Sequence, residues 1–229
     1  MQLSPRLQKI ASLIPQGTVI ADVGTDHGYI PVYCFEKGII KKAIAMDVNS
    51  QPLDRARVNL TKYGYIDSSE LRLSNGLEKL NKNEADVIVI AGMGGLLIAD
   101  ILKDGIDKIG GNTLLLLQPM IAPAELREAV CSYGLSIKDE YVVKEENKFY
   151  NIFAVQKGNQ TLDDELMYVG KNLLVNSTDT AYDYLNYKIR VCKNIISGHK
   201  LSQTPDTIAI QKYSHELEVY EKYIKELKR

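Results

Sequence analysis

Apolar residues in the first two thirds of the chain form short runs that alternate with helical spacings. The run Thr18–Val23 precedes a glycine loop and is typical of a strand buried in a parallel sheet. Before it, apolar positions at intervals of three or four residues predict a helix over 3–14 that Pro15 ends. The same alternation predicts strands at 42–47, 70–73, 85–91 and 112–117, and helices at 29–37, 50–63, 95–103 and 123–133.

Repeated strand–helix units predict an α/β fold with a mostly parallel, doubly wound, Rossmann-like sheet and right-handed crossovers. Two later runs, 136–144 and 148–156, are separated by a short polar break and predict an antiparallel hairpin that completes the sheet. We assign residues 1–158 to this first domain.

The pattern changes after Gly158, where helical spacing replaces the alternation. Apolar residues predict one helix over 162–173, and two longer helices carry apolar residues in steps of three and four, which is a heptad seam. The seam residues are Tyr182, Leu185, Ile189, Cys192 and Ile196, then Tyr213, Leu217, Tyr220, Ile224 and Leu227. With a turn over 198–205, residues 159–229 predict a second domain, a helical coiled-coil hairpin.

The composition restricts the class of protein but does not identify a binding partner. With 45% hydrophobic and 25% charged residues, the chain is typical of a globular protein, and no apolar run is long enough to cross a membrane. Three cysteines without a CxxC pair suggest free thiols in a reducing, cytoplasmic setting, and the histidines and cysteines lack metal-site spacing. A net charge of −1 means that any RNA contact must use local basic patches.

The loop after the first strand carries the strongest chemical signal. Gly24 and Gly28 let the backbone turn tightly beside a ligand, but they form G-x-x-x-G and lack the third glycine of dinucleotide sites. Asp22 and Asp26 in the loop would repel a pyrophosphate and attract a cation, which favours the sulfonium and amino groups of S-adenosylmethionine. The alternative is a plain glycine turn. Thr25 and His27 complete the loop, and packing explains His27 better than acid–base work.

Asp47 strengthens the cofactor assignment because it ends the second strand, where a carboxylate can accept both hydroxyls of a ribose. Capping of the following helix suits Asn49 or Ser50 better. After the third strand, Asn75 can hold the adenine edge, although Asn-Gly is equally natural in a turn. The expected cofactor contacts are Asp22, Gly24, Thr25, Asp26, His27, Gly28, Asp47, Val48, Asn75, Gly76, Ala91 and Gly92.

The fourth strand runs into Ala91-Gly-Met-Gly-Gly95, whose bare backbone would lie beside a transferable methyl group. An ordinary strand-to-helix turn is the alternative. The Asn/Asp-Pro-Pro-aromatic motif of amino-directed adenine methyltransferases is absent here, which argues against exocyclic N6 chemistry. Gln118 leaves the fifth strand on the same edge and can hydrogen-bond a base. Asn147 and Tyr150 lie at the hairpin break, where a reverse turn explains Asn147 as well as substrate contact does.

Four motifs in order resemble one family, the bacterial tRNA (adenine(22)-N1)-methyltransferases of the TrmK type. The segments are 22–31 (Asp-Val-Gly-Thr-Asp-His-Gly-Tyr-Ile-Pro), 46–49, 91–95 and 117–120, and the start of the chain fits the family's leader helix. The resemblance covers the whole chain, since that family joins a class I methyltransferase domain to a C-terminal coiled-coil hairpin. It implies methyl transfer from S-adenosylmethionine to N1 of adenine 22 in tRNA.

The resemblance also suggests roles for individual residues. Asp26, Met93 and Gln118 are the catalytic candidates, with Asp26 stabilising the cationic product. The expected tRNA contacts are Arg6, Gly94, Gly95, Pro119, Asn147 and Tyr150. We expect no metal, no membrane and a monomer. A small-molecule methyltransferase on the same fold and a non-catalytic cofactor-binding module remain the alternatives.

Overall fold

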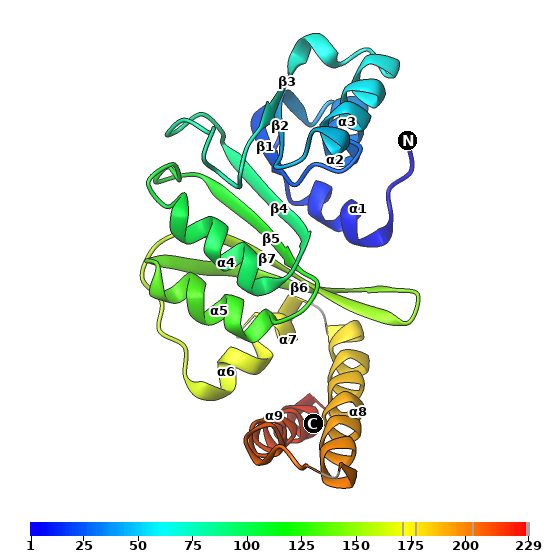
Figure 1. Ribbon diagram of the computed structural model, residues 1–229, viewed down its shortest axis with the longest axis vertical. Helices are drawn as coiled ribbons and strands as arrows, with labels where there is room; N and C mark the ends of the chain where they lie inside the picture. Colours follow the sequence, from blue (N-terminus) through cyan, green and yellow to red (C-terminus); the bar gives the residue numbers. More distant parts are fainter. Residues whose placement is uncertain (171, 177, 203, 228–229) are drawn as a thin grey trace.

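The computed structural model describes residues 1–170, 172–176, 178–202 and 204–227. Its centre is a seven-stranded sheet in the order β3-β2-β1-β4-β5-β7-β6, in which β1 to β5 are parallel and β7 and β6 antiparallel (Figure 1). The strands are β1 (Thr18–Val23), β2 (Ile40–Asp47), β3 (Ser69–Leu73), β4 (Val87–Met93), β5 (Leu114–Pro119), β6 (Leu135–Glu145) and β7 (Lys148–Lys157). The predicted Rossmann-like sheet with its terminal hairpin is confirmed.

Helices cover both faces of the sheet. On one face lie α4 (Gly95–Asp104) and α5 (Pro123–Ser132), and on the other α1 (Pro5–Ser12), α2 (Tyr29–Glu36) and α3 (Ser50–Lys62) (Figure 1). Successive β1 side chains enter opposite cores, because Ile20 packs with α1 and α2 whereas Ala21 and Val23 pack on the α4 side. A short 3₁₀ helix, η1 (Ile66–Ser68), precedes β3. The continuous apolar run in the sequence reflects burial on both faces.

The C-terminal helices pack at the end of the molecule opposite α3 (Figure 1). They are α6 (Asp164–Val169), α7 (Leu173–Asn176), α8 (Thr178–Leu201) and α9 (Thr207–Leu227). Cys192 lies beside Glu216 and Lys188 lies over the Tyr220 ring, so α8 and α9 run antiparallel. The expected helical hairpin is therefore present, while the domain boundary at 158/159 stays a prediction.

Three details of the predicted C-terminal helices were wrong. The single helix over 162–173 is two short helices, because Gly170 has a φ of 81° and ends the first. The helix α8 continues through Gly198 to Leu201, so the predicted turn over 198–205 begins too early. Tyr182 is 39% exposed, whereas Ala181, four residues before Leu185, is fully buried.

A polar cluster joins these helices to the sheet. Arg127 of α5 and Glu140 of β6 form an ion pair in which neither side chain is more than 1% exposed. Arg127 also donates to the Met167 carbonyl oxygen at 2.6 Å, and Asn151 joins Glu140 to the Tyr184 hydroxyl. A third apolar core, which combines Val142 of β6 with side chains from α6 to α9, surrounds this junction cluster.

None of the described helices is long and apolar enough to cross a membrane. The three cysteines are free thiols; Cys34 and Cys192 are buried, and burial raises the pKa of Cys34 to about 12.

Candidate functional site

A pocket of about 720 Å³ opens where the parallel strands end. In sheets of this kind, ligands bind at the carboxyl ends of the strands, where the strand order reverses. Here that reversal lies between β1 and β4, and both strands contribute to the pocket. Its lining residues are Met1, Gln2, Leu3, Ser4, Arg6, Leu7, Asp22, Gly24, Asp26, Tyr29, Ile30, Asp47, Ala91, Gly92, Met93 and Glu145.

Gly24 forms the floor of the pocket at the end of β1. Its φ is 72°, and a Cβ at this position would overlap the Met93 methyl group. The amides of Gly24 and Thr25 both donate to the Met46 carbonyl oxygen, at 2.8 and 2.9 Å, which anchors the loop to β2. The positive φ therefore favours glycine here, and a Cβ would displace the end of the Met93 side chain.

Asp22 lies beneath the same loop and is 7% exposed. Burial raises the pKa of its carboxyl to about 6, although the hydroxyl of Thr25 donates to it at 2.6 Å and opposes that shift. The nearby Asp47 carboxylate raises the pKa further. A cationic ligand in the pocket would favour the ionised form of Asp22.

Asp47 lines the pocket at the end of β2, as the sequence predicts. Its Oδ1 accepts the Asn49 amide at 2.8 Å, so one carboxylate oxygen orders the turn into α3. Val48 is 59% exposed, and neither Asn75 nor Gly76 lines the main pocket; both line a neighbouring hollow of about 580 Å³ beside α4. The roles of these last three residues in cofactor binding stay predictions.

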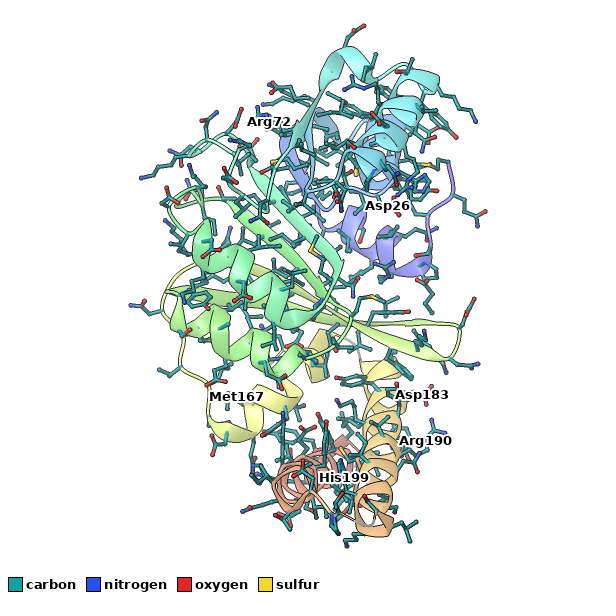
Figure 2. The ribbon with its side chains drawn as sticks, in the orientation of Figure 1. Asp26, Arg72, Met167, Asp183, Arg190 and His199 are labelled. Atoms are coloured by element: carbon teal, nitrogen blue, oxygen red, sulfur yellow. The ribbon has the colours of Figure 1, made fainter. Side chains whose placement is uncertain are left out.

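The other residues of the glycine loop differ in whether they line the pocket. Asp26 lines the pocket, has a side chain that is 62% exposed, and accepts the Arg55 guanidinium at 2.9 Å (Figure 2). His27, with a φ of 63°, stacks its ring on Tyr29 and lies outside the pocket lining, and Gly28 packs against Ala56. The Nε2 of His27 also lies 3.5 Å from Asp26 Oδ1, and the role of His27 stays a prediction.

The end of β4 holds the bare backbone that the sequence predicts, but as a bulged strand. Met93 still pairs with Pro119, with a register shift after Ala91. Gly92 has a φ of 79°, and Gly94 precedes α4 as its N-cap. The Gly95 amide donates to the Ile121 carbonyl oxygen at 2.9 Å, and a Cβ on Gly95 would overlap Ala122, so this glycine lets two loops meet.

Gln118 connects that bulge to the first helix. It is fully buried, and its Oε1 accepts both the Gly92 amide at 3.1 Å and an Arg6 guanidinium nitrogen at 2.6 Å. Its amide nitrogen donates to the Pro119 carbonyl oxygen. Gln118 therefore positions Arg6 and Gly92, and its direct contact with a base stays a prediction.

The hairpin of β6 and β7 completes the pocket on the side away from Asp47. The Arg6 guanidinium lies 5.4 Å from the centre of the Tyr150 ring, while Asn147 is exposed at the turn between the strands. Glu145, the last residue of β6, lines the pocket and accepts the Arg6 amide at 3.1 Å. The pocket thus has acidic groups at both ends and one guanidinium between the β4 bulge and the hairpin.

Sequence reasoning missed Ser4 and Glu145 as pocket residues. The helical spacing near Ser4 predicted a packed helix, and Glu145 lay just beyond the predicted end of its strand. Only the return of β7 beside β5 brings the hairpin to the carboxyl edge. Among the described residues, no group of three or more His, Cys, Asp or Glu side chains could hold a metal ion.

Comparisons with known proteins show the family to which the chain belongs. Residues 3–153 match the model of the methyltransferase domain. The tRNA (adenine(22)-N(1))-methyltransferase of Bacillus subtilis (strain 168) is 33% identical over 218 residues, which cover 95% of this chain and 82% of the relative.

Solved structures extend the likeness to nearly the whole fold. The B. subtilis M1A22 tRNA methyltransferase TrmK has a TM-score of 0.84 at 30% identity, covering 97% of this chain and 99% of its own. M. capricolum TrmK in complex with S-adenosyl-homocysteine has a TM-score of 0.82 at 28% identity, covering 98% and 99%. The chain belongs to the tRNA (adenine(22)-N1)-methyltransferase family, with a class I methyltransferase fold.

Proposed function

We propose that this protein transfers a methyl group from S-adenosylmethionine to N1 of adenine 22 in tRNA. The pocket itself supports the proposal, because it is lined both by Asp47, where a ribose would bind, and by the bare backbone at Gly92. We further propose that it acts as a monomer in the cytoplasm.

The residues present fit S-adenosylmethionine, which supplies an electrophilic methyl group when bound. Asp47 lines the pocket where a nucleoside ribose would lie, and Gly24 provides a floor that a Cβ would fill. The buried Asp22 offers a carboxylate whose ionised form a cationic ligand would stabilise. Thr25, His27, Gly28, Val48, Asn75 and Gly76 are proposed supporting positions.

The acceptor would enter between the β4 bulge and the hairpin. N1 of adenine carries an in-plane lone pair, so it can attack a methyl group without losing a proton first. The work of the protein is then to hold the two groups in line and exclude water. We assign Met93, Gly94, Gly95 and Pro119 to the walls of this acceptor site, with Arg6 and Tyr150 holding the base.

N1 lies on the Watson–Crick edge, so the target base must leave its stack to enter the pocket. Contacts to the tRNA backbone must come from local groups because the chain has a net charge of −1. On α8, Arg190 is exposed and faces away from α9 (Figure 2), whereas Lys193 is paired with Glu221. We propose Arg190 as the better phosphate contact.

The test is incubation with methyl-labelled cofactor and total tRNA beside a panel of small acceptors, followed by nucleoside analysis. We expect label in 1-methyladenosine from tRNA. Label in small acceptors alone would support a small-molecule methyltransferase, and cofactor binding without any transfer would support a non-catalytic module. Either result would reject the proposed function.

A further inference from the structure

Two buried polar atoms at the pocket lack hydrogen-bond partners. They are Ser4 Oγ and Arg6 Nε, which have no partner among the described residues. Ser4 is the N-cap of α1, yet its side chain makes no capping bond, and both residues line the pocket. Because buried polar groups are nearly always paired in native proteins, these two atoms mark pocket-lining side chains whose hydrogen-bonding capacity is unused.

Glu145 lines the same pocket and uses only one of its two carboxylate oxygens in a hydrogen bond. Its Oε2 accepts the Arg6 amide, one of the donors that the first turn of a helix leaves unpaired, so this oxygen caps α1. Its Oε1 accepts no hydrogen bond from the part of the chain that the structure describes. The pocket lining therefore includes a carboxylate oxygen free to accept a hydrogen bond, on the same pocket as Ser4 and Arg6.

The position of Glu145 in the sheet separates it from the cofactor. Asp47 ends β2 and Gly24 follows β1, whereas Glu145 ends β6 at the far edge, beyond β4 and β5. The cofactor side of the pocket therefore lies toward β2, and Glu145 stands on the acceptor side. Asp26 belongs to the cofactor side, and Arg55 already binds its carboxylate.

We propose that Glu145 is a catalytic residue that accepts a hydrogen bond from the N6 amino group of the target adenine, with Ser4 and Arg6 holding the same base. This role of Glu145 rests on the proposed function, methyl transfer to N1 of adenine 22. Adenine presents an amino donor at this edge, whereas guanine presents the O6 acceptor, which a carboxylate would repel. Glu145 would thus select adenine.

The same contact assists the chemistry. As the bond from N1 to the methyl carbon forms, the bond from sulfur to that carbon breaks and its electrons stay on sulfur. No proton leaves, so the base becomes a cation whose charge is shared between N1 and N6. The Glu145 carboxylate stabilises that charge, and it also offsets the guanidinium of Arg6, which would oppose a cation in the same pocket.

The test compares Glu145→Gln with Glu146→Gln. A glutamine at position 145 keeps an oxygen for the Arg6 amide, so α1 stays capped while the charge is lost. Glu146 is exposed at the hairpin turn and does not line the pocket, which makes it the matched control. We expect Glu145→Gln to lower kcat about 100-fold. Cofactor affinity and the melting temperature should match those of the control.

Binding gives a second readout that does not depend on turnover. Wild-type protein should hold tRNA carrying 1-methyladenosine more tightly than the same tRNA with adenine, and Glu145→Gln should remove that preference. An unchanged kcat in Glu145→Gln, or equally weakened binding of both tRNAs by this variant, would overturn the assignment. Absence of methylation by the wild-type protein would instead reject the proposed function, so the two failures are distinguishable.

Discussion

Two clusters of charged side chains lie along β6, one at its middle and one at its carboxyl end, and they differ in how completely they are paired. At the junction with the C-terminal helices, Arg127 and Glu140 are fully buried and bonded to each other and to neighbouring backbone. At the pocket, Arg6 and Glu145 are partly exposed and leave polar atoms unused. A cluster whose polar groups are all hydrogen-bonded holds elements together, whereas a cluster with unpaired polar groups can bind a ligand.

The largest expected effect is the difference in stability between a variant of the junction cluster and a variant of the pocket cluster. Arg127→Met leaves Glu140 as an uncompensated buried charge and should lower the free energy of unfolding by about 3–5 kcal/mol. Arg6→Met removes a partly exposed group and should cost at most about 1 kcal/mol, while it slows methyl transfer strongly. Denaturant unfolding measures both. Equal losses of stability would contradict the distinction.

A matched pair of glycines tests the pocket floor. Gly24 and Gly17 have φ values of 72° and 76°, but a Cβ on Gly24 meets Met93 whereas one on Gly17 meets nothing within 4 Å. Both alanine variants should lose about 1–2 kcal/mol of stability from the left-handed backbone. Only Gly24→Ala should also weaken cofactor binding, because the Met93 side chain that the new Cβ displaces lines the pocket. Calorimetric titration with S-adenosylmethionine measures this, and equal affinities would show that the Met93 contact is unimportant.

Asp22 should make cofactor binding depend on pH. Its folded pKa of about 6 lies above the ordinary value of 3.8, so the folded state holds this proton longer than the unfolded chain. The free energy of unfolding contributed by Asp22 therefore falls as pH rises between these values.

A cationic cofactor favours the ionised form of Asp22, so affinity should rise about tenfold per pH unit up to about pH 6 and then level off. Titrations at several pH values measure the slope. Asp22→Asn should flatten it, and an unchanged slope in that variant would assign the dependence to another group.

The smallest effect concerns Asp26. Its exposed carboxylate is paired with Arg55, so its charge is partly compensated. We expect Asp26→Asn to slow turnover by no more than about fivefold while weakening cofactor binding less. An unchanged rate would remove Asp26 from the mechanism. A larger loss of turnover in Asp26→Asn than in Glu145→Gln would make Asp26 the more important carboxylate for catalysis.

The sequence predicted features that local pattern determines. The burial of β1 on both faces produced a recognisable apolar run, and the glycine loop and Asp47 are placed by strand ends that periodicity detects. These positions follow one another along neighbouring strands, so their meeting at one edge follows from the fold class alone.

Long-range packing determines the features that the sequence did not predict. Arg127 and Glu140 lie in amphipathic segments where charged residues are normally solvated, and only the docked C-terminal helices bury them. Glu145 reaches the pocket because β7 pairs antiparallel with β5, and β6 in turn pairs antiparallel with β7. The Gly170 break shows the same limit, since apolar spacing continues across a residue whose backbone conformation ends the helix.

Primer extension on a tRNA transcript after incubation with S-adenosylmethionine, compared with a transcript carrying guanine at position 22, tests both the methylated position and the choice of adenine. A methyl group on N1 blocks the Watson–Crick edge and stops the polymerase. We expect a stop at position 22 with adenine and none with guanine. A stop elsewhere, or none on either transcript while tRNA is still methylated, would contradict this expectation.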